Sequence, residues 1–182
     1  MMKRFSLILS LLALGLGATP TLTSCNKESS FVKQQREFDE AQKQRDETAI
    51  QAYLTRHAIT NAQRLESGIY LVPVTDGATT NPLIVAGQTV KVNYVGRFIS
   101  EALDGQVFDA SSNNRTACGC LSFVNGPNSG LITGWSTATL QMRKGDRKLI
   151  LIPSSLAYQG QSSGAIPAYT PLLFDMEILD VQ

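Results

Sequence analysis

The fold of this chain is decided by residues 90–96, which read Val90-Lys91-Val92-Asn93-Tyr94-Val95-Gly96. Apolar side chains alternate here with polar ones, and successive side chains of a β-strand point to opposite faces of its sheet. The stretch therefore predicts a strand with one buried face. Segments rich in β-branched and aromatic residues predict further strands at residues 69–72, 107–108, 121–124, 148–152 and 172–178.

A single short helix is predicted in the same region, at residues 136–141. Strands that share a sheet and leave one face to be buried need such a helix to cover that face. We therefore expect an α+β fold, in which a curved antiparallel β-sheet wraps around one short α-helix. This domain is expected to occupy residues 67–182, because the alternating pattern of strands begins after Ser67-Gly68.

Residues 25–66 differ in composition and are expected to form a charged tether and a helix in front of the domain. Opposite charges recur at helical spacing, as in Lys33 with Glu37 and Arg36 with Glu40. An apolar stripe suited to docking on the domain occurs only in the second half, at Ile50, Tyr53, Leu54, His57 and Ala58. No heptad pattern is sustained, so we expect a monomer.

The N-terminus has the pattern of a bacterial secretion signal. Lys3 and Arg4 precede an apolar run at residues 5–16, which is too short for a comfortable membrane span. The residues before Cys25 resemble a bacterial lipobox, so we expect a lipoprotein signal peptide at residues 1–24 and lipidation of Cys25. An ordinary signal peptide with a coincidental cysteine is the alternative. Lipidation predicts a membrane-anchored protein of the cell envelope that faces the periplasm or the exterior.

Charge and residue content exclude several classes of function. Two of the sixteen basic residues lie in the signal, so the mature chain has fourteen basic and fifteen acidic residues and a net charge of −1. This charge, and the lack of a basic segment with interleaved aromatics, argue against a nucleic-acid partner. His57 is the single histidine, so no metal site is expected. No motif indicates a cofactor or a covalent nucleophile.

Aromatic residues recur through the second half of the chain, typically beside a glycine or an aspartate. The series runs through Asp104-Gly105-Gln106-Val107-Phe108-Asp109, Gly130-Leu131-Ile132-Thr133-Gly134-Trp135, Ala157-Tyr158, Ile166-Pro167 and Leu172-Leu173-Phe174. In this order it resembles the FKBP-type peptidyl-prolyl cis/trans isomerases. The resemblance implies the curved sheet and helix described above, and rotation of Xaa-Pro bonds in extracytoplasmic polypeptides. It implies proline-containing unfolded or nascent polypeptides and FK506-like macrolides as partners.

The resemblance also assigns roles to individual residues. Trp135 would form the floor beneath the proline ring, and the Tyr158 hydroxyl and the Ile132 amide would bind substrate carbonyls. The catalytic set carried over from the family is Tyr94, Phe108, Asp109, Ile132, Trp135, Tyr158 and Phe174. The residues expected to bind substrate beside this set are Leu121, Leu131 and Ile166.

This residue content suits rotation of a prolyl bond. Resonance gives the peptide bond a rotational barrier of about 18–20 kcal/mol, and twisting the bond removes the resonance and shifts charge off the carbonyl oxygen. An apolar cavity that fits the twisted amide lowers this barrier without any covalent step. Taken singly, each aromatic residue is as well explained by core packing, but the ordered set favours a pocket.

The chain departs from the family pattern around the expected pocket. Leu121 stands where an aromatic wall residue is common, and residues 161–165 lack the bulky or histidine residue sometimes found at the rim. These departures leave two alternatives open. One is a chaperone-like polypeptide-binding lipoprotein with little or no isomerase turnover, and the other is a purely structural lipoprotein on the same fold.

Two cysteines, Cys118 and Cys120, lie in a polar insertion between expected pocket strands. Outside the cytoplasm, thiols this close together are usually oxidised, so a disulfide between them is one expectation. Paired surface thiols are the alternative. A local staple of the loop and a redox role are both compatible with the spacing.

Overall fold

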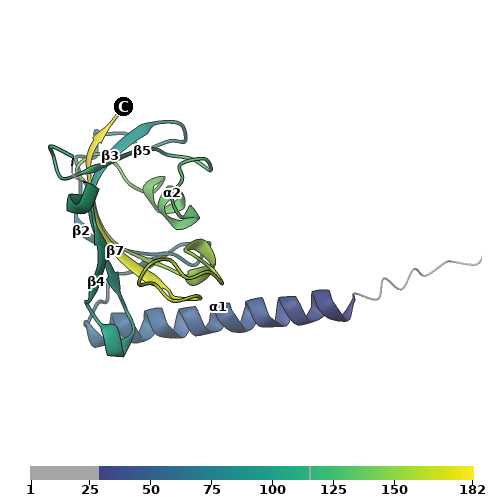
Figure 1. Cartoon of the computed structure of the whole chain (residues 1–182). Helices are drawn as coiled ribbons and strands as arrows, with labels where there is room; N and C mark the ends of the chain where they lie inside the picture. The colour runs from purple at the N-terminus through teal and green to yellow at the C-terminus, as the bar shows by residue number, and fades with distance from the viewer. Residues whose placement is uncertain (1–28, 115) are drawn as a thin grey trace, which may run out of the picture.

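The computed structural model describes residues 29–114 and 116–182 (Figure 1). The expected signal peptide at residues 1–24 and the expected lipidation site Cys25 lie outside the described residues. Within them the chain forms one curved antiparallel sheet, a short helix inside its curve and a long N-terminal helix across its end. The α+β fold expected from the sequence is confirmed.

The described residues form a seven-stranded sheet in the order β1-β2-β6-β7-β3-β4, with β5 paired to β3 beside this path. The strands are β1 (Gln63–Arg64), β2 (Tyr70–Thr75), β3 (Thr89–Phe98), β4 (Val107–Ala110), β5 (Leu121–Val124), β6 (Arg147–Ile152) and β7 (Leu172–Val181). Strand β3 organises the sheet, because β7 pairs along its length while β5 and β4 pair with its two halves. The side chains of β3 alternate in burial, as its sequence predicts.

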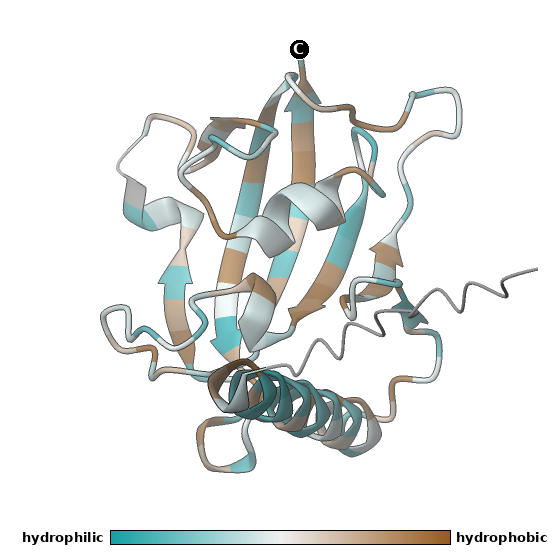
Figure 2. Ribbon diagram, turned by 90° about the vertical axis from the view of Figure 1, so that its right-hand side faces the viewer, coloured by the Kyte–Doolittle hydropathy of each residue, from teal (hydrophilic) through white to brown (hydrophobic). Residues whose placement is uncertain are grey.

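Helix α2 (Thr133–Thr139) lies inside the curve of the sheet, across one face (Figures 1 and 2). It starts three residues before the predicted helix at residues 136–141, and therefore includes Trp135. A Cβ atom on Gly134 would lie only 2.4 Å from Cγ2 of Ile152. Glycine thus permits the helix to approach the sheet closely at this point, and Trp135 packs into the main core.

The sheet has a second core on its opposite face, where the N-terminal helix α1 (Ser30–Arg56) packs. Tyr70, Leu151 and Leu173 alternate along their strands with residues of the main core and therefore point to this second face. From α1 this core receives Ile50, Tyr53 and Leu54. The main core covers one face of the sheet and α1 covers the other, so consecutive residues are buried at the end of β6 and the start of β7. The sequence analysis expected only one buried face.

Helix α1 ends earlier than its apolar stripe predicts. It stops at Arg56, and Ala58 has a φ of 51°, in the left-handed region that commonly terminates helices. The prediction was wrong for Ala58, which is exposed, whereas His57 is exposed but still contacts the domain through Asp104. At its other end α1 extends beyond the sheet (Figure 1). None of the described helices combines the length and apolar character needed to cross a bilayer.

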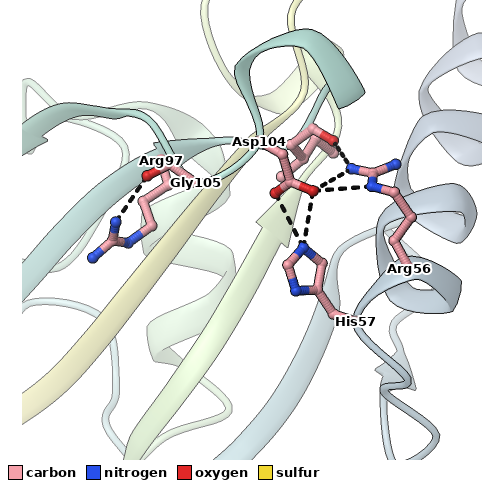
Figure 3. A network of polar contacts seen from close by, with 6 residues as sticks. Arg56, His57, Arg97, Asp104 and Gly105 are labelled. Carbon is pink, nitrogen blue, oxygen red and sulfur yellow. Dashed lines mark hydrogen bonds and ion pairs between the residues drawn. The ribbon is translucent and has the colours of Figure 1, made fainter.

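The C-terminal end of α1 is tied to the turn between β3 and β4 through Asp104 (Figure 3). Arg56 Nε donates to the Asp104 carboxylate at 2.9 Å, and Nε2 of His57 lies 3.0 Å from both carboxylate oxygens. Arg97 holds the same turn from the strand, donating to the Gly105 carbonyl at 2.8 Å. Burial disfavours ionised Asp104, but hydrogen bonds from His57 and Arg56 outweigh it and lower the pKa of its carboxyl.

We predict that the Asp104→Asn variant loses stability in a pH-dependent way. A carboxyl with a lowered pKa in the folded state stabilises the fold above its unfolded pKa, and this contribution is lost as the pH falls through the folded pKa. The difference in unfolding free energy between wild type and variant should be larger at about pH 5 than at about pH 2. Urea denaturation at both pH values measures it. Glu101→Gln removes an exposed carboxylate from the same turn and is the control; a difference independent of pH would contradict the prediction.

Candidate functional site

A cavity of about 840 Å³ lies between α2, the inner face of the sheet and the loop that follows β6. All ten residues that the sequence analysis assigned to the pocket line this cavity: Tyr94, Phe108, Asp109, Leu121, Leu131, Ile132, Trp135, Tyr158, Ile166 and Phe174. They come from separate strands, from α2 and from loops, and the fold brings them together. The role of each in binding or catalysis stays a prediction.

The floor of the cavity is a cluster of aromatic rings around Trp135, which is 3% exposed. The Trp135 ring centroid lies 4.8 Å from that of Tyr94 and 5.2 Å from that of Phe174, with interplanar angles of 83° and 85°. Such edge-to-face contacts are the favoured geometry for aromatic pairs. On another side Phe123 packs against the indole at 5.8 Å. The indole is thereby held in one orientation.

Phe108 extends this cluster along one wall. Its ring meets Phe174 edge-to-face at 5.6 Å and packs on Phe98 at 5.2 Å. The ring lies over the backbone of Gly96, where a Cβ atom would be 2.5 Å from Cε2 of Phe108. Because Gly96 has no side chain, it leaves space for the Phe108 ring that forms this wall of the cavity.

Phe108 and Asp109 are neighbours in β4, yet both line the cavity. Successive side chains of a regular strand point to opposite faces, but here the register shifts, because Gly96 pairs with Asp109 whereas Arg97 pairs with Val107. Phe108 is the extra residue of a β-bulge, a feature that re-aims side chains. The bulge explains how consecutive residues contribute to one site.

The Asp109 carboxylate is held by hydrogen bonds from several groups. The Tyr94 hydroxyl donates to its Oδ2 at 2.6 Å, while the Ala110 amide and the Asn113 side chain donate to Oδ1 at 2.8 and 3.2 Å. A partly buried carboxylate is tolerable when it is hydrogen-bonded in this way. Asp109 and Tyr94 thus form a fixed polar edge beside the aromatic floor.

Two other polar groups of the lining retain hydrogen-bonding capacity. Among the described residues, the Tyr158 hydroxyl and the Ile132 amide have no hydrogen-bond partner. Tyr158 is 37% exposed, and Ile132 caps the start of α2. These are the two groups that the sequence analysis expected to bind carbonyls of a polypeptide.

A segment that we call the rim loop (residues 154–169) borders the cavity and contributes residues 157–161 and 163–166 to its lining. Gln159 and Tyr169 both have a φ of 55°, and the Tyr169 amide donates to the Gln159 carbonyl at 2.6 Å. The sequence analysis expected residues 161–165 at the rim, but it did not identify Ala157, Gln159 and Gly160 as lining residues. These residues contribute through their place in the loop, and no side-chain pattern indicates that.

A disulfide joins Cys118 to Cys120, directly before β5. Leu121, the first residue of β5, lines the cavity. The Thr116 hydroxyl donates to the Cys120 carbonyl at 2.8 Å and accepts from the Cys120 amide at 3.0 Å. Of the alternatives that the sequence left open, the structure has the oxidised pair, placed as a local staple between β4 and β5.

The lining of the cavity contains few ionisable groups. Among the described residues that line it, the titratable side chains are Tyr94, Asp109 and Tyr158. The remaining lining is apolar or neutral, with glutamine, serine, threonine and glycine at the rim. The arrangement suits an apolar ring flanked by groups that accept hydrogen bonds.

Known proteins with similar sequences share this region. The family model for FKBP-type peptidyl-prolyl cis-trans isomerase matches residues 81–179. FK506-binding protein 2 of Emericella nidulans is 32% identical over 111 residues, which are 61% of this chain and 77% of that protein. FK506-binding protein 5 of Dictyostelium discoideum is 31% identical over 110 residues, which are 60% of this chain and 6% of that protein. The chain therefore spans only a small part of the latter relative.

A solved structure agrees with the sequence comparisons. The crystal structure of a peptidyl-prolyl cis-trans isomerase from Pseudomonas syringae pv. tomato has a TM-score of 0.62 and 29% identity, covering 79% of this chain and 95% of that one. The segment matched by the family model includes all ten predicted residues of the cavity. The chain belongs to the FKBP-type peptidyl-prolyl cis-trans isomerases.

Proposed function

We propose that this protein is a catalytically active member of its family and rotates Xaa-Pro bonds of polypeptides outside the cytoplasm. The observation that supports this most directly is the meeting of all ten predicted residues in one cavity. In particular, the Tyr158 hydroxyl and the Ile132 amide stand beside an aromatic floor with hydrogen-bonding capacity to spare. FK506-like macrolides are proposed to compete for the same cavity.

In the proposed mechanism the substrate proline ring lies on Trp135, and the substrate carbonyls accept hydrogen bonds from Tyr158 and Ile132. The planar ground state of the amide is the more dipolar one, so an apolar cavity that excludes water disfavours it relative to the twisted state. Groups that fit the twisted amide better than either planar isomer increase the rate in both directions. Asp109, fixed by Tyr94, orients the polar edge and undergoes no proton transfer.

We predict that Phe108→Ala lowers kcat/KM for a proline-containing peptide by about tenfold or more, because a displaced cavity wall no longer fits the twisted amide. A protease-coupled assay on the full chain measures this. Phe31→Ala is the matched control, since Phe31 lies on α1 outside the cavity and is 73% exposed. A wild-type rate equal to the uncatalysed rate would contradict the proposed activity and favour a binding module without turnover.

We also propose that Cys25 is lipidated and holds the protein on a membrane of the cell envelope, facing the periplasm or the exterior. The support is the apolar run and the lipobox-like residues before Cys25. Helix α1 begins at Ser30, a few residues after Cys25, and it extends about 12 Å before Phe38 makes its contact with the rim-loop residue Tyr169. An anchor at Cys25 would therefore place a rigid spacer between the membrane and the isomerase cavity.

Replacing Cys25 by serine is predicted to move the protein from the membrane fraction to the soluble fraction. Acyl chains contribute about 0.8 kcal/mol per buried methylene, and this attachment is absent without the thiol. Fractionation of the expressing bacterium and the mass of the mature protein measure the change. The paired replacement of Cys118 and Cys120 by serine leaves Cys25 in place and should stay membrane-bound. A wild-type protein whose mature mass includes no acyl chains would refute lipidation.

A further inference from the structure

Helix α1 contacts both ends of the rim loop through one stripe of its surface. Phe38, Gln42 and Asp46 are spaced by four residues, so they lie on the same face of the helix. Asp46 contacts Ser154 at the start of the rim loop, while Gln42 and Phe38 contact Tyr169 at its end. In Figure 1 this loop lies between α2 and α1.

Asp46 makes the closest of these contacts. Its side chain is 2% exposed, and its Oδ2 accepts hydrogen bonds from the Ser154 amide at 2.8 Å and the Ser154 hydroxyl at 2.7 Å. Its Oδ1 accepts from Gln42 Nε2 at 2.8 Å. A buried carboxylate is costly to desolvate and is kept only where donors satisfy it. Here the principal donors belong to a loop of the cavity.

Ser154 in turn fixes the segment that includes Tyr158. It begins a 3-10 turn, η3 (Ser154–Leu156), and its carbonyl accepts from the amides of Ala157 at 3.0 Å and Gln159 at 2.9 Å. Ala157, Tyr158 and Gln159 all line the cavity. A movement of Asp46 would therefore displace Ser154, and Ser154 would displace Tyr158 through the hydrogen-bonded turn η3.

The far end of the rim loop is held by the other two residues of the stripe. Gln42 Nε2 lies 3.4 Å from the Tyr169 carbonyl, and the Phe38 ring meets the Tyr169 ring edge-to-face at 5.2 Å. The Tyr169 ring lies against Gly160, where a Cβ atom would be 2.6 Å from its hydroxyl. Fixing Tyr169 thus fixes Gly160, a lining residue of the cavity.

Between these two ends the rim loop packs on the main core through Leu156, Ala157 and Ile166, whereas Gln159 and Gly160 are exposed. A second cavity of about 340 Å³ separates α1 from the loop, and Gln159 and Gly160 line both cavities. These residues form a thin partition with space on either side. Gln159 also has a left-handed backbone, which is held in place only when its surroundings enforce it. The contacts with α1 at the loop ends therefore restrain the segment around Gln159 and Gly160, whereas Ile166 is held by the main core.

We propose that Asp46, together with Gln42 and Phe38, positions the rim loop, so that α1 is a structural part of the prolyl cavity. These are positioning residues, since they act through Ser154 and Tyr169 and do not line the 840 Å³ cavity. The inference rests on the proposed isomerase function. It assigns a role in substrate recognition to a segment that lies outside residues 81–179, the part matched by the family model.

The test compares Asp46→Asn with the wild type as full chains. Asparagine keeps the shape of the side chain but replaces one acceptor oxygen by a donor NH2. The hydrogen bonds from Ser154 and from Gln42 therefore cannot all be kept in their present geometry, and those that remain lose the carboxylate charge. We expect amide exchange at Ser154, Ala157 and Gln159 to accelerate about tenfold and kcat/KM to fall about fivefold or more, largely through a higher KM. Glu37→Gln removes an exposed carboxylate from the same helix and should change neither quantity.

The combined readouts separate positioning from general instability. Loss of folded protein lowers kcat in proportion to the inactive fraction and leaves KM unchanged, whereas a displaced rim raises KM. Ser154→Ala removes only the hydroxyl donor and should produce a smaller change in the same direction, which tests the proposal even if Asp46→Asn does not fold. An active wild type with unchanged exchange or unchanged KM in both variants would overturn the inference alone. An inactive wild type would instead overturn the proposed function.

Discussion

Helix α2 is too short to cover the whole concave face of the sheet. The cavity lies on the part of this face that α2 leaves uncovered. Seven helical residues extend about 10 Å, whereas the ten-residue strands β3 and β7 extend about 33 Å. The uncovered part must be filled by large side chains and by loops. Aromatic rings around Trp135 fill the base, the rim loop borders the remainder, and the incomplete filling between them is the cavity.

Backbone irregularities at the edge of the sheet adapt this frame to a binding site. The bulge at Phe108 brings an aromatic ring and a carboxylate to the same space, and Gly96 leaves room for that ring. The carboxylate of Asp109 is stabilised because Tyr94, a member of the aromatic floor, donates a hydrogen bond to it. Tyr94 thus belongs to both the apolar and the polar part of the cavity. A substitution that moves its ring would also move the Asp109 carboxylate.

Strands β2 to β7 were predictable because their signals are local, and the pocket residues followed from the family resemblance. No strand was predicted at β1, which lies within residues 25–66. Alternation at residues 90–96 predicted β3, and the aromatics beside glycine and aspartate resembled a known ordered series. The early start of α2 was not predictable, since Thr133 and Gly134 are poor helix formers and packing against Ile152 overrides that preference. The contact of α1 with the rim loop was missed because Gln42 and Asp46 dock through hydrogen bonds, for which apolar periodicity gives no signal.

Trp135 is the one tryptophan of the chain, and it lies at the base of the cavity in contact with Tyr94 and Phe174. All indole fluorescence of this protein therefore originates beside the cavity. The native molecule therefore contains its own optical probe, and we expect its emission to change when a ligand alters the surroundings of this nearly buried ring. Occupancy of the cavity is measurable on the unlabelled protein, with no background from a second indole.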